Sequence, residues 1–381
     1  MEKYNLPEKL IQEMTEIRQY LHKNPELSGK EYKTTEFIKE FLSKRNIKIL
    51  PLDLNTGVVA EIGEGEKVIA LRADIDALPI KEATDLPYRS VNEGVMHACG
   101  HDFHTASLLG AAAVLKEMEE ELKMRVRLIF QPSEEVNSGA HEVIEAGGLE
   151  GAVAIVGFHN KPDLPVGTIG IKEGPLMAAV DKFEVTIRGT GTHAAAPHNG
   201  NDPLITAVQI VNGVQAIVSR HVSPLDSAVI SITRIEGGNT WNVIPETVEL
   251  EGTMRTYSKT VQEKIKGMFT HIVEGYTSAF GQECEIIWGE GHPSVDNDKG
   301  LANIIKEEAE KFAEVVIPEV TLGGEDFSLY MQKVSGFFAF IGTGSLYEWH
   351  HPKFLVRDEA LFYGINYYIA SVKALIKKFY I

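Results

Sequence analysis

The sequence predicts an α/β fold: a larger domain with a central, mostly parallel sheet flanked by helices, and an inserted ferredoxin-like α+β domain. Three observations lead to this prediction. Apolar runs typical of buried strands alternate with helical patterns at both ends of the chain, as in sheets covered by helices on both faces. In the middle, the order of elements changes to βαββαβ, the order of a ferredoxin-like module. At 381 residues, the chain also exceeds the size at which one core usually keeps growing.

The elements of the larger domain follow from hydrophobic periodicity. The opening segments carry apolar residues at helical spacing, whereas the strands are short and rich in β-branched residues. Strands are predicted at 57–63, 67–74, 126–131, 152–159 and 337–342, and helices at 7–23, 30–44, 104–122, 301–315 and within 361–380.

The inserted domain begins after the loop IKEGPLMAAVD and ends where Gly and Asp cluster near GEGHPSVDND. Its predicted strands are 182–189, 227–235, 247–257 and 284–289, and its helices are 202–221 and 260–280. The domain boundaries that follow are residues 1–180 with 291–381 for the larger domain and residues 181–290 for the insertion.

Composition and charge exclude several classes of function. The net charge of −17 would repel a phosphate backbone, and no basic run with interleaved aromatic residues is present, so we expect no nucleic-acid partner. The amphipathic start lacks the apolar core of a secretory signal, and no apolar stretch is long enough to cross a bilayer. We therefore expect a cytoplasmic protein without a membrane partner. Two cysteines, Cys99 and Cys284, are too few for a disulfide framework.

Residues of the kinds that bind metals follow the predicted strands of the larger domain. The carboxyl ends of parallel strands share one edge of a sheet, so these residues should converge in one crevice. Cys99 and His101 lie in a loop that leads into a helix on the same side. The residues at strand ends are Asp74, Asp76, Glu134, Glu135, His159, His350 and His351.

The chemistry of this set favours divalent cations. Adjacent carboxylates such as Glu134 and Glu135 are unfavourable in a buried crevice without a cation, because like charges raise one pKa sharply. Imidazoles, a thiolate and carboxylates suit zinc or similar ions, and two metals can share bridging ligands. Each residue alone has an ordinary structural explanation, but four separate loops at one edge carry such residues. We expect one Glu to ligate and the other to transfer the proton.

Eight motifs in order along nearly the whole chain resemble the M20 metallopeptidase family. The resemblance is narrower to its amidohydrolase subfamily, which includes aminoacylases, hippurate hydrolases, N-acetyl-amino-acid deacetylases and auxin-conjugate hydrolases. The motifs are RQYLHKNPELSGKE (18–31), RADIDALPI (72–80), MHACGHDFHTA (96–106), FQPSEE (130–135), GTHAAAPH (191–198), WNVIPE (241–246), GGEDF (323–327) and WHHPKF (349–354).

The resemblance implies two divalent metal ions per chain, which could be Zn, Mn, Co or Ni. The implied ligands are Cys99, His101, Glu135, His159 and His350. The doubled histidine leaves His351 open as the alternative to His350.

The resemblance also implies the roles of the acids near the metals. Glu134 matches the general base, and Asp74 matches an active-site acid that acts by orienting a ligand. Asp76 either shares that role or closes its strand. Asp102 is expected to orient His101 from behind, and His104 is expected to cap or pack rather than ligate.

In the resembled family, the inserted domain acts as a lid and carries the dimer contact, which implies a homodimer. His193 resembles the residue that reaches the scissile carbonyl, in some members from the partner subunit. Asn242 and Arg255 resemble residues that hold the amide and the carboxylate of the substrate. Without the resemblance, a turn histidine and an exposed strand charge would explain His193 and Arg255.

The implied function of the catalytic metal-binding domain is metal-dependent amide hydrolysis of N-acyl amino acids, such as N-acetyl amino acids. The small-molecule substrate would yield a carboxylate and a free amino acid through a metal-bridged hydroxide and a Glu base. One alternative is a dipeptidase or carboxypeptidase of the same family. The other is a non-catalytic binding protein that retains an inherited metal site.

Overall fold

The computed structural model describes residues 4–136, 138–289 and 291–380, and the chain divides into two compact units. The first unit comprises Met1–Gly174, Asp296–Glu319 and Asp326–Ile381, and the second comprises Pro175–Val295 and Val320–Glu325. The chain thus enters the second unit twice, and the return at 320–325 was not expected from the sequence. Of the predicted domain limits, residues 1, 290 and 381 lie outside the described residues.

The first unit is built on an eight-stranded mixed sheet. Its four central strands, β4, β3, β5 and β16, are parallel, whereas β2 and β6 flank them in antiparallel orientation. The unit is therefore a mixed α/β structure with a mostly parallel centre. In sheet order, the strands are β1 (Lys48–Ile49), β2 (Val58–Ile62), β4 (Arg125–Gln131), β3 (Val68–Asp74), β5 (Ala152–Lys161), β16 (Ser335–Gly342), β6 (Thr168–Gly170) and β15 (Glu314–Val316).

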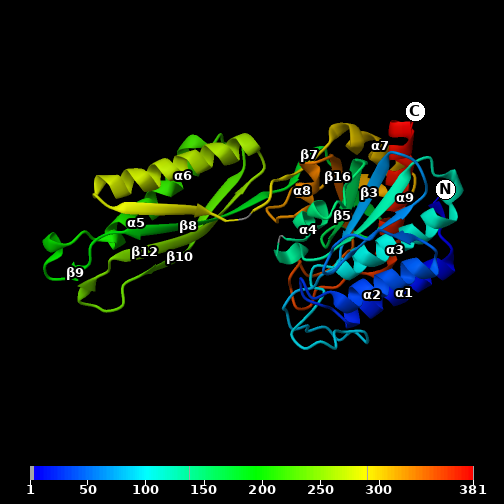
Figure 1. Ribbon diagram of the computed structural model, residues 1–381, viewed down its shortest axis with the longest axis horizontal. Coiled ribbons are helices and arrows are strands. Elements are labelled where there is room, and N and C mark those ends of the chain that lie inside the picture. Colours follow the sequence, from blue (N-terminus) through cyan, green and yellow to red (C-terminus); the bar gives the residue numbers. More distant parts are fainter. Residues whose placement is uncertain (1–3, 137, 290, 381) are drawn as a thin grey trace. The chain divides into compact units, whose positions relative to one another are not determined.

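Helices cover both faces of this sheet, which explains why β3 is buried along its whole length. Figure 1 shows α1, α3 and α9 on one side of the sheet and α4 and α8 on the other. The helices of the unit are α1 (Glu8–Lys23), α2 (Tyr32–Lys44), α3 (His101–Glu117), α4 (Gly139–Glu145), α7 (Lys299–Ala309), α8 (Phe327–Met331) and α9 (Leu361–Tyr380). Short helical turns are η2 (Glu119–Glu121), η3 (Glu134–Val136) and η6 (Asp358–Ala360).

Helix α3 is buried on nearly all sides, because α1 and α9 pack against it above the sheet. Small residues make this close packing possible. A Cβ atom on Gly110 would lie 2.6 Å from Cδ1 of Ile365, and one on Gly364 would lie 2.4 Å from the hydroxyl of Ser107. The two glycines thus let α3 and α9 approach closely and fix the position of α3 over the sheet.

Two predicted helices of the first unit differ clearly from the structure in their limits. The helix predicted over 104–122 begins one turn earlier, because Gly100 takes a left-handed conformation with φ of 86° and starts α3 at His101. The helix predicted over 301–315 ends at Ala309. The β-branched pair Val315 and Val316 then forms β15, which pairs in parallel with β6.

The second unit has a four-stranded antiparallel sheet in the order β10-β12-β8-β13. Residues of β8 and β12 alternate between buried and more exposed, so one face packs on α5 and α6 around Phe183 and Phe269. The main elements follow the ferredoxin-like order βαββαβ. They are β8 (Ala179–Arg188), α5 (Pro203–Ala216), β10 (Ala228–Gly237), β12 (Thr247–Thr256), α6 (Lys259–Ala279) and β13 (Glu283–Trp288).

The second unit also contains a small two-stranded sheet and short helical turns. These elements are β9 (Thr192–His193), β11 (Val243–Ile244), η4 (Pro197–Asn199) and η5 (Ile217–His221). The strands β7 (Gly174–Met177) and β14 (Val295–Asn297) lie where the chain passes between the units. Within the described residues, every helix is too short or too polar to cross a lipid bilayer.

Candidate functional site

The ligand-type residues of the first unit converge where the central parallel strands end. His159 lies near the end of β5, and Glu134 and Glu135 form the turn η3 that follows β4. Cys99 and His101 stand at the start of α3, where the left-handed Gly100 separates them. The loop after β16 contributes His350. The structure thus brings together all five ligands predicted from the sequence, with Glu134 beside them.

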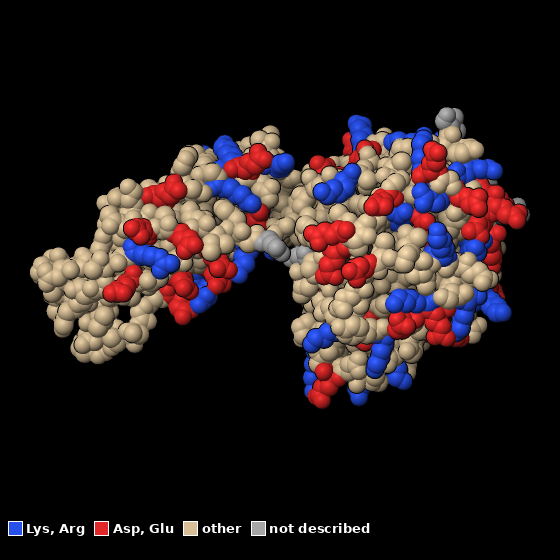
Figure 2. All heavy atoms as spheres, viewed as in Figure 1, with Lys and Arg blue, Asp and Glu red and all other residues tan. Residues whose placement is uncertain are grey.

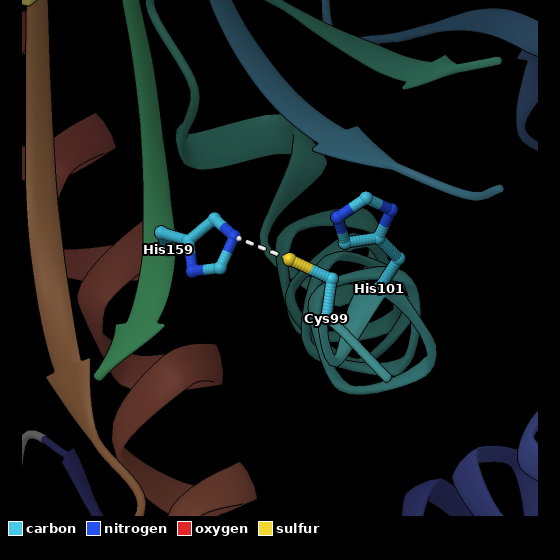
Figure 3. A group of neighbouring side chains, drawn as sticks. All are labelled: Cys99, His101 and His159. Carbon is cyan, nitrogen blue, oxygen red and sulfur yellow. Dashed lines mark hydrogen bonds between the residues drawn. The ribbon is translucent and has the colours of Figure 1, made fainter. Parts of the chain in front are cut away.

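Two groups of three donors share the Cys99 thiol. The first group is Cys99, His101 and His159, and the second is Cys99, Glu135 and His350; within each group the donor atoms lie within 4.8 Å of one another. Figure 3 shows Cys99 and His159 pointing toward each other, with Sγ and Nε2 3.3 Å apart, and His101 beside Cys99. Because Cys99 belongs to both groups, the geometry suits two cations that share a thiolate ligand.

The donors also fit divalent cations by their hydrogen bonding and charge. Among the described residues, His101 Nε2 and Glu135 Oε1 are buried polar atoms without a hydrogen-bond partner. Burial raises the pKa of the Cys99 thiol, and the nearby Glu135 and Glu134 carboxylates raise it further. Burial also raises the pKa of Glu135 to about 7. Cations at this place would satisfy the unpaired donors and favour the charged thiolate and carboxylate.

The carboxylate that orients His101 belongs to Asp76. The His101 Nδ1–H donates to Asp76 Oδ1 at 3.1 Å, which leaves Nε2 for a metal. The other oxygen of Asp76 accepts from the Ser28 hydroxyl at 2.7 Å and from the Glu135 amide at 3.0 Å. Asp76 therefore holds a predicted ligand from each donor group. Of the two roles left open by the sequence, this geometry favours the orienting one.

Asp74 makes different contacts. Its Oδ1 accepts from His104 Nδ1 at 2.6 Å, and its Oδ2 accepts from Arg72 at 2.7 Å. The Asp74 Oδ2 atom lies 3.7 Å from His101 Nε2. Burial opposes the charge of Asp74, but His101, His104 and Arg72 together hold its pKa well below the ordinary value. Asp74 therefore remains ionised and anchors His104 most directly.

His104 is occupied on both ring nitrogens. Its Nδ1–H donates to Asp74, and its Nε2 accepts from the Asn160 backbone amide at 3.0 Å. The ring is therefore neutral and unavailable to a metal, as expected for a packing residue. His159 donates its Nδ1–H to the Asn160 carbonyl at 2.8 Å, which leaves Nε2 facing Cys99.

The expectation that Asp102 orients His101 is wrong. Asp102 instead accepts from Arg18 at 3.1 Å and from His22 at 3.0 Å, both in α1. The side chain points toward α1 because the next helical position lies about 100° around α3 from His101. Burial opposes the charge of His22, but Asp102 and Glu82 raise its pKa to about 9. This ion cluster ties α1 to the start of α3.

The loop after β16 distinguishes His350 from His351. His350 has a left-handed φ of 64°, its amide donates to the Ala98 carbonyl at 2.9 Å, and its Nε2 lies 3.6 Å from Glu135 Oε2. His351 instead stacks on Tyr347, and its Nδ1 accepts from the Lys353 amide at 3.0 Å. The geometry therefore favours His350 as the ligand.

Glu31 is a supporting residue that the sequence analysis did not single out. Its buried carboxylate accepts from the amides of Ser133 at 2.9 Å and Gly29 at 3.0 Å, and from the Thr56 hydroxyl at 2.8 Å. Ser133 has a left-handed φ of 56° and directly precedes Glu134. Glu31 thus braces the strained turn that presents Glu134. The only signal in the sequence is its place in the SGKE motif.

The three predicted substrate-binding residues all lie in the second unit, but the structure does not bring them together. His193 and Asn242 line one cavity of about 780 Å³, and the Ala194 amide donates to the Asn242 carbonyl at 3.0 Å. Arg255 lies near the other end of the sheet, opposite Val180 in the β12–β8 register. Its guanidinium donates to the Met254 carbonyl at 3.1 Å.

Comparisons with known proteins agree with this geometry. The family model described as peptidase family M20/M25/M40 matches residues 70–374. An N-acetyl-L-cysteine deacetylase of Bacillus subtilis is 49% identical over 96% of this chain and 89% of that protein. A thermostable carboxypeptidase of Saccharolobus solfataricus is 38% identical over 92% of each chain. A crystal structure from Bacillus subtilis, described as a dinuclear metal binding peptidase from the M20 family, superimposes with a TM-score of 0.88 at 45% identity, covering 98% of this chain and 99% of the other.

Proposed function

The chain belongs to the peptidase family M20/M25/M40 and is a metal-dependent amidohydrolase, and from this premise we propose that it hydrolyses N-acyl amino acids. The products would be a carboxylate and a free amino acid. The single observation that carries this proposal is the pair of donor groups that share Cys99 and lie beside the buried Glu134. The similarity to an N-acetyl-L-cysteine deacetylase supports a small N-acyl substrate.

Two divalent metal ions serve as cofactors. Cys99, His101 and His159 would hold one ion, and Cys99, Glu135 and His350 would hold the other. When bound, the ions supply Lewis acidity and lower the pKa of water. The protein's part is to fix the donors, which Asp76 does for His101 and for the backbone of Glu135.

Glu134 is proposed as the general base. It directly follows the braced Ser133, it is 8% exposed, and its Oε2 lies 4.0 Å from His101 Nε2. From this place Glu134 can accept a proton from water and then donate it to the departing amine. Asp74 is proposed as a positioning residue, since its contacts hold His104 and Arg72.

We propose that the second unit is a lid that also forms a homodimer, and strand geometry supports this. Thr247 pairs with Arg188 at one end of β12, and Arg255 pairs with Val180 near the other. Eight residue steps separate these ends, about 27 Å at the usual rise of a strand. His193 lies beyond the Thr247 end, because it pairs with Val243. One small substrate cannot contact His193 and Arg255 of the same chain. In the proposed site, Arg255 acts with His193 of the partner subunit.

Surface features of the second unit support the dimer. Strand β10 is an edge strand, and α5 exposes Ile205 and Val208. Trp241, two residues before the Val243 that pairs with His193, is 92% exposed. Figure 2 shows no Lys, Arg, Asp or Glu on the visible surface around β9. The uncharged surface around β9 (Figure 2), with the exposed Trp241 nearby, is suited to pairing with a second copy.

Mixed dimers test this arrangement. H193A and E134Q homodimers should both lack activity, but a subunit mixture should recover about a quarter of wild-type activity, because half of the random dimers contain one intact site. A mixture that stays inactive, or a monomeric wild type in solution, would refute the shared site.

The general-base assignment has its own test. E134Q should keep both metals, measured by elemental analysis, and lose about 100-fold or more in kcat on N-acetyl amino acids. The matched variant Glu142→Gln in α4 should keep full activity. Undiminished turnover in E134Q would remove Glu134 from the mechanism.

A carboxypeptidase activity is the second candidate, favoured by the 38% identical Saccharolobus relative. Parallel assays of N-acetyl, N-benzoyl and dipeptide substrates separate the two activities. A non-catalytic binding protein would show no hydrolysis of any of them after metal reconstitution. The cytoplasmic location expected from the sequence stays a prediction.

A further inference from the structure

We infer that the hydrogen bond between the Trp349 indole and the Asn160 side chain positions His350, and so controls the affinity of one of the two metal ions independently of the other. The inference rests on the proposed function, because it takes His350 as a ligand. The pair lies wholly within the first unit, behind the predicted donors.

Asn160 joins three segments that carry predicted ligands. Its Oδ1 accepts from Trp349 Nε1 at 3.1 Å, and its Nδ2 donates to the Cys99 carbonyl at 2.5 Å. Its backbone carbonyl accepts from His159 Nδ1 at 2.8 Å. Asn160 is completely buried, so water cannot readily replace these bonds. Its amide therefore fixes the loop that ends in His350 to the segment that carries Cys99.

Trp349 is held in the position that this bond requires. Its ring meets the His159 ring edge to face, with centroids 4.9 Å apart, and the Lys161 ammonium lies 5.0 Å from its centroid. The ring thus packs against two side chains of β5. The hydrogen bond from the indole N–H to Asn160 fixes the orientation of the Trp349 ring. It thereby also fixes the backbone between Trp349 and His350.

His350 depends on this backbone more than the other predicted ligands do. The side chain of His350 is 53% exposed, whereas Cys99, His101 and His159 are buried. Few neighbours therefore pack around its imidazole. Its φ of 64° is unfavourable for a residue with a Cβ, so the loop must hold it there. The anchors of this loop include the bond from the His350 amide to the Ala98 carbonyl, the Trp349–Asn160 pair, and the bond from the Ala83 amide to the Pro352 carbonyl at 2.8 Å.

The two donor groups make this role separable from a general structural one. His350 belongs to the group with Cys99 and Glu135, but not to the group with Cys99, His101 and His159. If His350 is held less firmly, the affinity for the ion that it ligates should fall and the affinity for the other ion should stay unchanged. A loss of general stability would weaken both.

The experiment is a calorimetric titration of the metal-free protein with Co²⁺, together with the thiolate-to-cobalt absorption band. W349F keeps an aromatic ring but lacks the N–H donor. The first ion is the one that Cys99, His101 and His159 would hold, and the second is the one that Cys99, Glu135 and His350 would hold. In W349F we expect the first ion to bind within about 3-fold of wild type. The second ion should bind roughly 10- to 100-fold more weakly, the range found for residues that support metal ligands. The control W288F makes the same change at a side chain that packs against Phe183 and Phe269 in the second unit, and it should leave both ions unaffected.

A double-mutant cycle tests the pair itself. N160A removes the acceptor, so adding W349F to N160A should cause little further loss at the second ion. N160A also removes the donor to the Cys99 carbonyl, so by itself it should weaken both ions. Should W349F fail to fold, W349Y, which also keeps an aromatic ring and lacks the indole N–H, must weaken the second ion more than the first. Wild-type affinity for both ions in W349F, or equal weakening of both, would overturn the inference. A wild type that binds fewer than two ions would instead refute the proposed dinuclear site.

Discussion

Glu31 offers a sharp test of how the site is supported, because two substitutions separate its hydrogen bonds from its charge. E31A removes the acceptor for Ser133, Gly29 and Thr56. E31Q can keep all three bonds. Its amide oxygen accepts from the two backbone amides, and its NH₂ donates to the Thr56 hydroxyl, which can act as donor or acceptor. We therefore expect the two variants to differ strongly.

The expected magnitude follows from the groups left unpaired. A buried polar group without a partner costs about 1–3 kcal/mol, and E31A leaves up to three of them. Removing a buried carboxylate offsets part of this loss, because burial raises the pKa of Glu31. We expect E31A to lower the free energy of unfolding by about 3 kcal/mol, or the Tm of this unit by about 6–10 °C. We expect less than about 1.5 kcal/mol for E31Q.

The pH dependence adds a second criterion with a defined sign. Because the pKa of Glu31 is raised in the folded state, the folded protein loses stability as the pH rises above 4.5, the ordinary pKa of a glutamate. The glutamine cannot ionise, so E31Q should gain stability relative to wild type between pH 4 and pH 7. Chemical denaturation at both pH values, followed by circular dichroism, measures this difference. If E31Q is as unstable as E31A, the charge rather than the hydrogen bonds supports the turn, and the reasoning fails.

Two further predictions address acid stability and the doubled histidine. Burial opposes ionisation of Glu308, but Lys311 and Lys377 lower its pKa to about 2, so its stabilising effect should be lost as pH falls from about 4.5 to about 2. E308Q should lower the free energy of unfolding at pH 7 by about 2 kcal/mol and flatten the acid transition; an unchanged transition would contradict the assignment. H350A should bind one metal ion fewer in elemental analysis, whereas H351A should bind as many as wild type; the reverse result would exchange their roles.

The sequence predicted the elements well where hydrophobic periodicity dominates. The parallel strands are buried on both faces, so their apolar runs stand out, and Glu134, Glu135 and His159 follow from the rule that ligands gather at strand ends. The short β15 was missed because three residues carry too little periodicity, and its pairing with β6 depends on the tertiary fold.

The sequence could not show which of several nearby aspartates orients His101. Asp74, Asp76 and Asp102 all lie within a few residues of predicted ligands, yet only Asp76 makes the short hydrogen bond to His101. Asp74 and Asp76 are two residues apart on or just after β3, and Asp102 adjoins His101 on a helix. Their contacts depend on where the side chains point after α1 and α3 have packed together. Asp102, for example, accepts a hydrogen bond from Arg18 of α1 instead of contacting His101. Sequence distance carries no such information.

The buried charges explain why strand ends, rather than loops alone, fix this site. Arg72 on β3 donates to Asp74 at the end of the same strand and to Asp326 before α8, while Gln131 at the end of β4 also donates to Asp326. The two strands and the turn before α8 are thus joined by groups that cannot be left unpaired without a large cost. A shift of any one segment breaks a buried charged hydrogen bond. The position of His104, and through Asn160 that of the donors, is in this way tied to the rigid sheet.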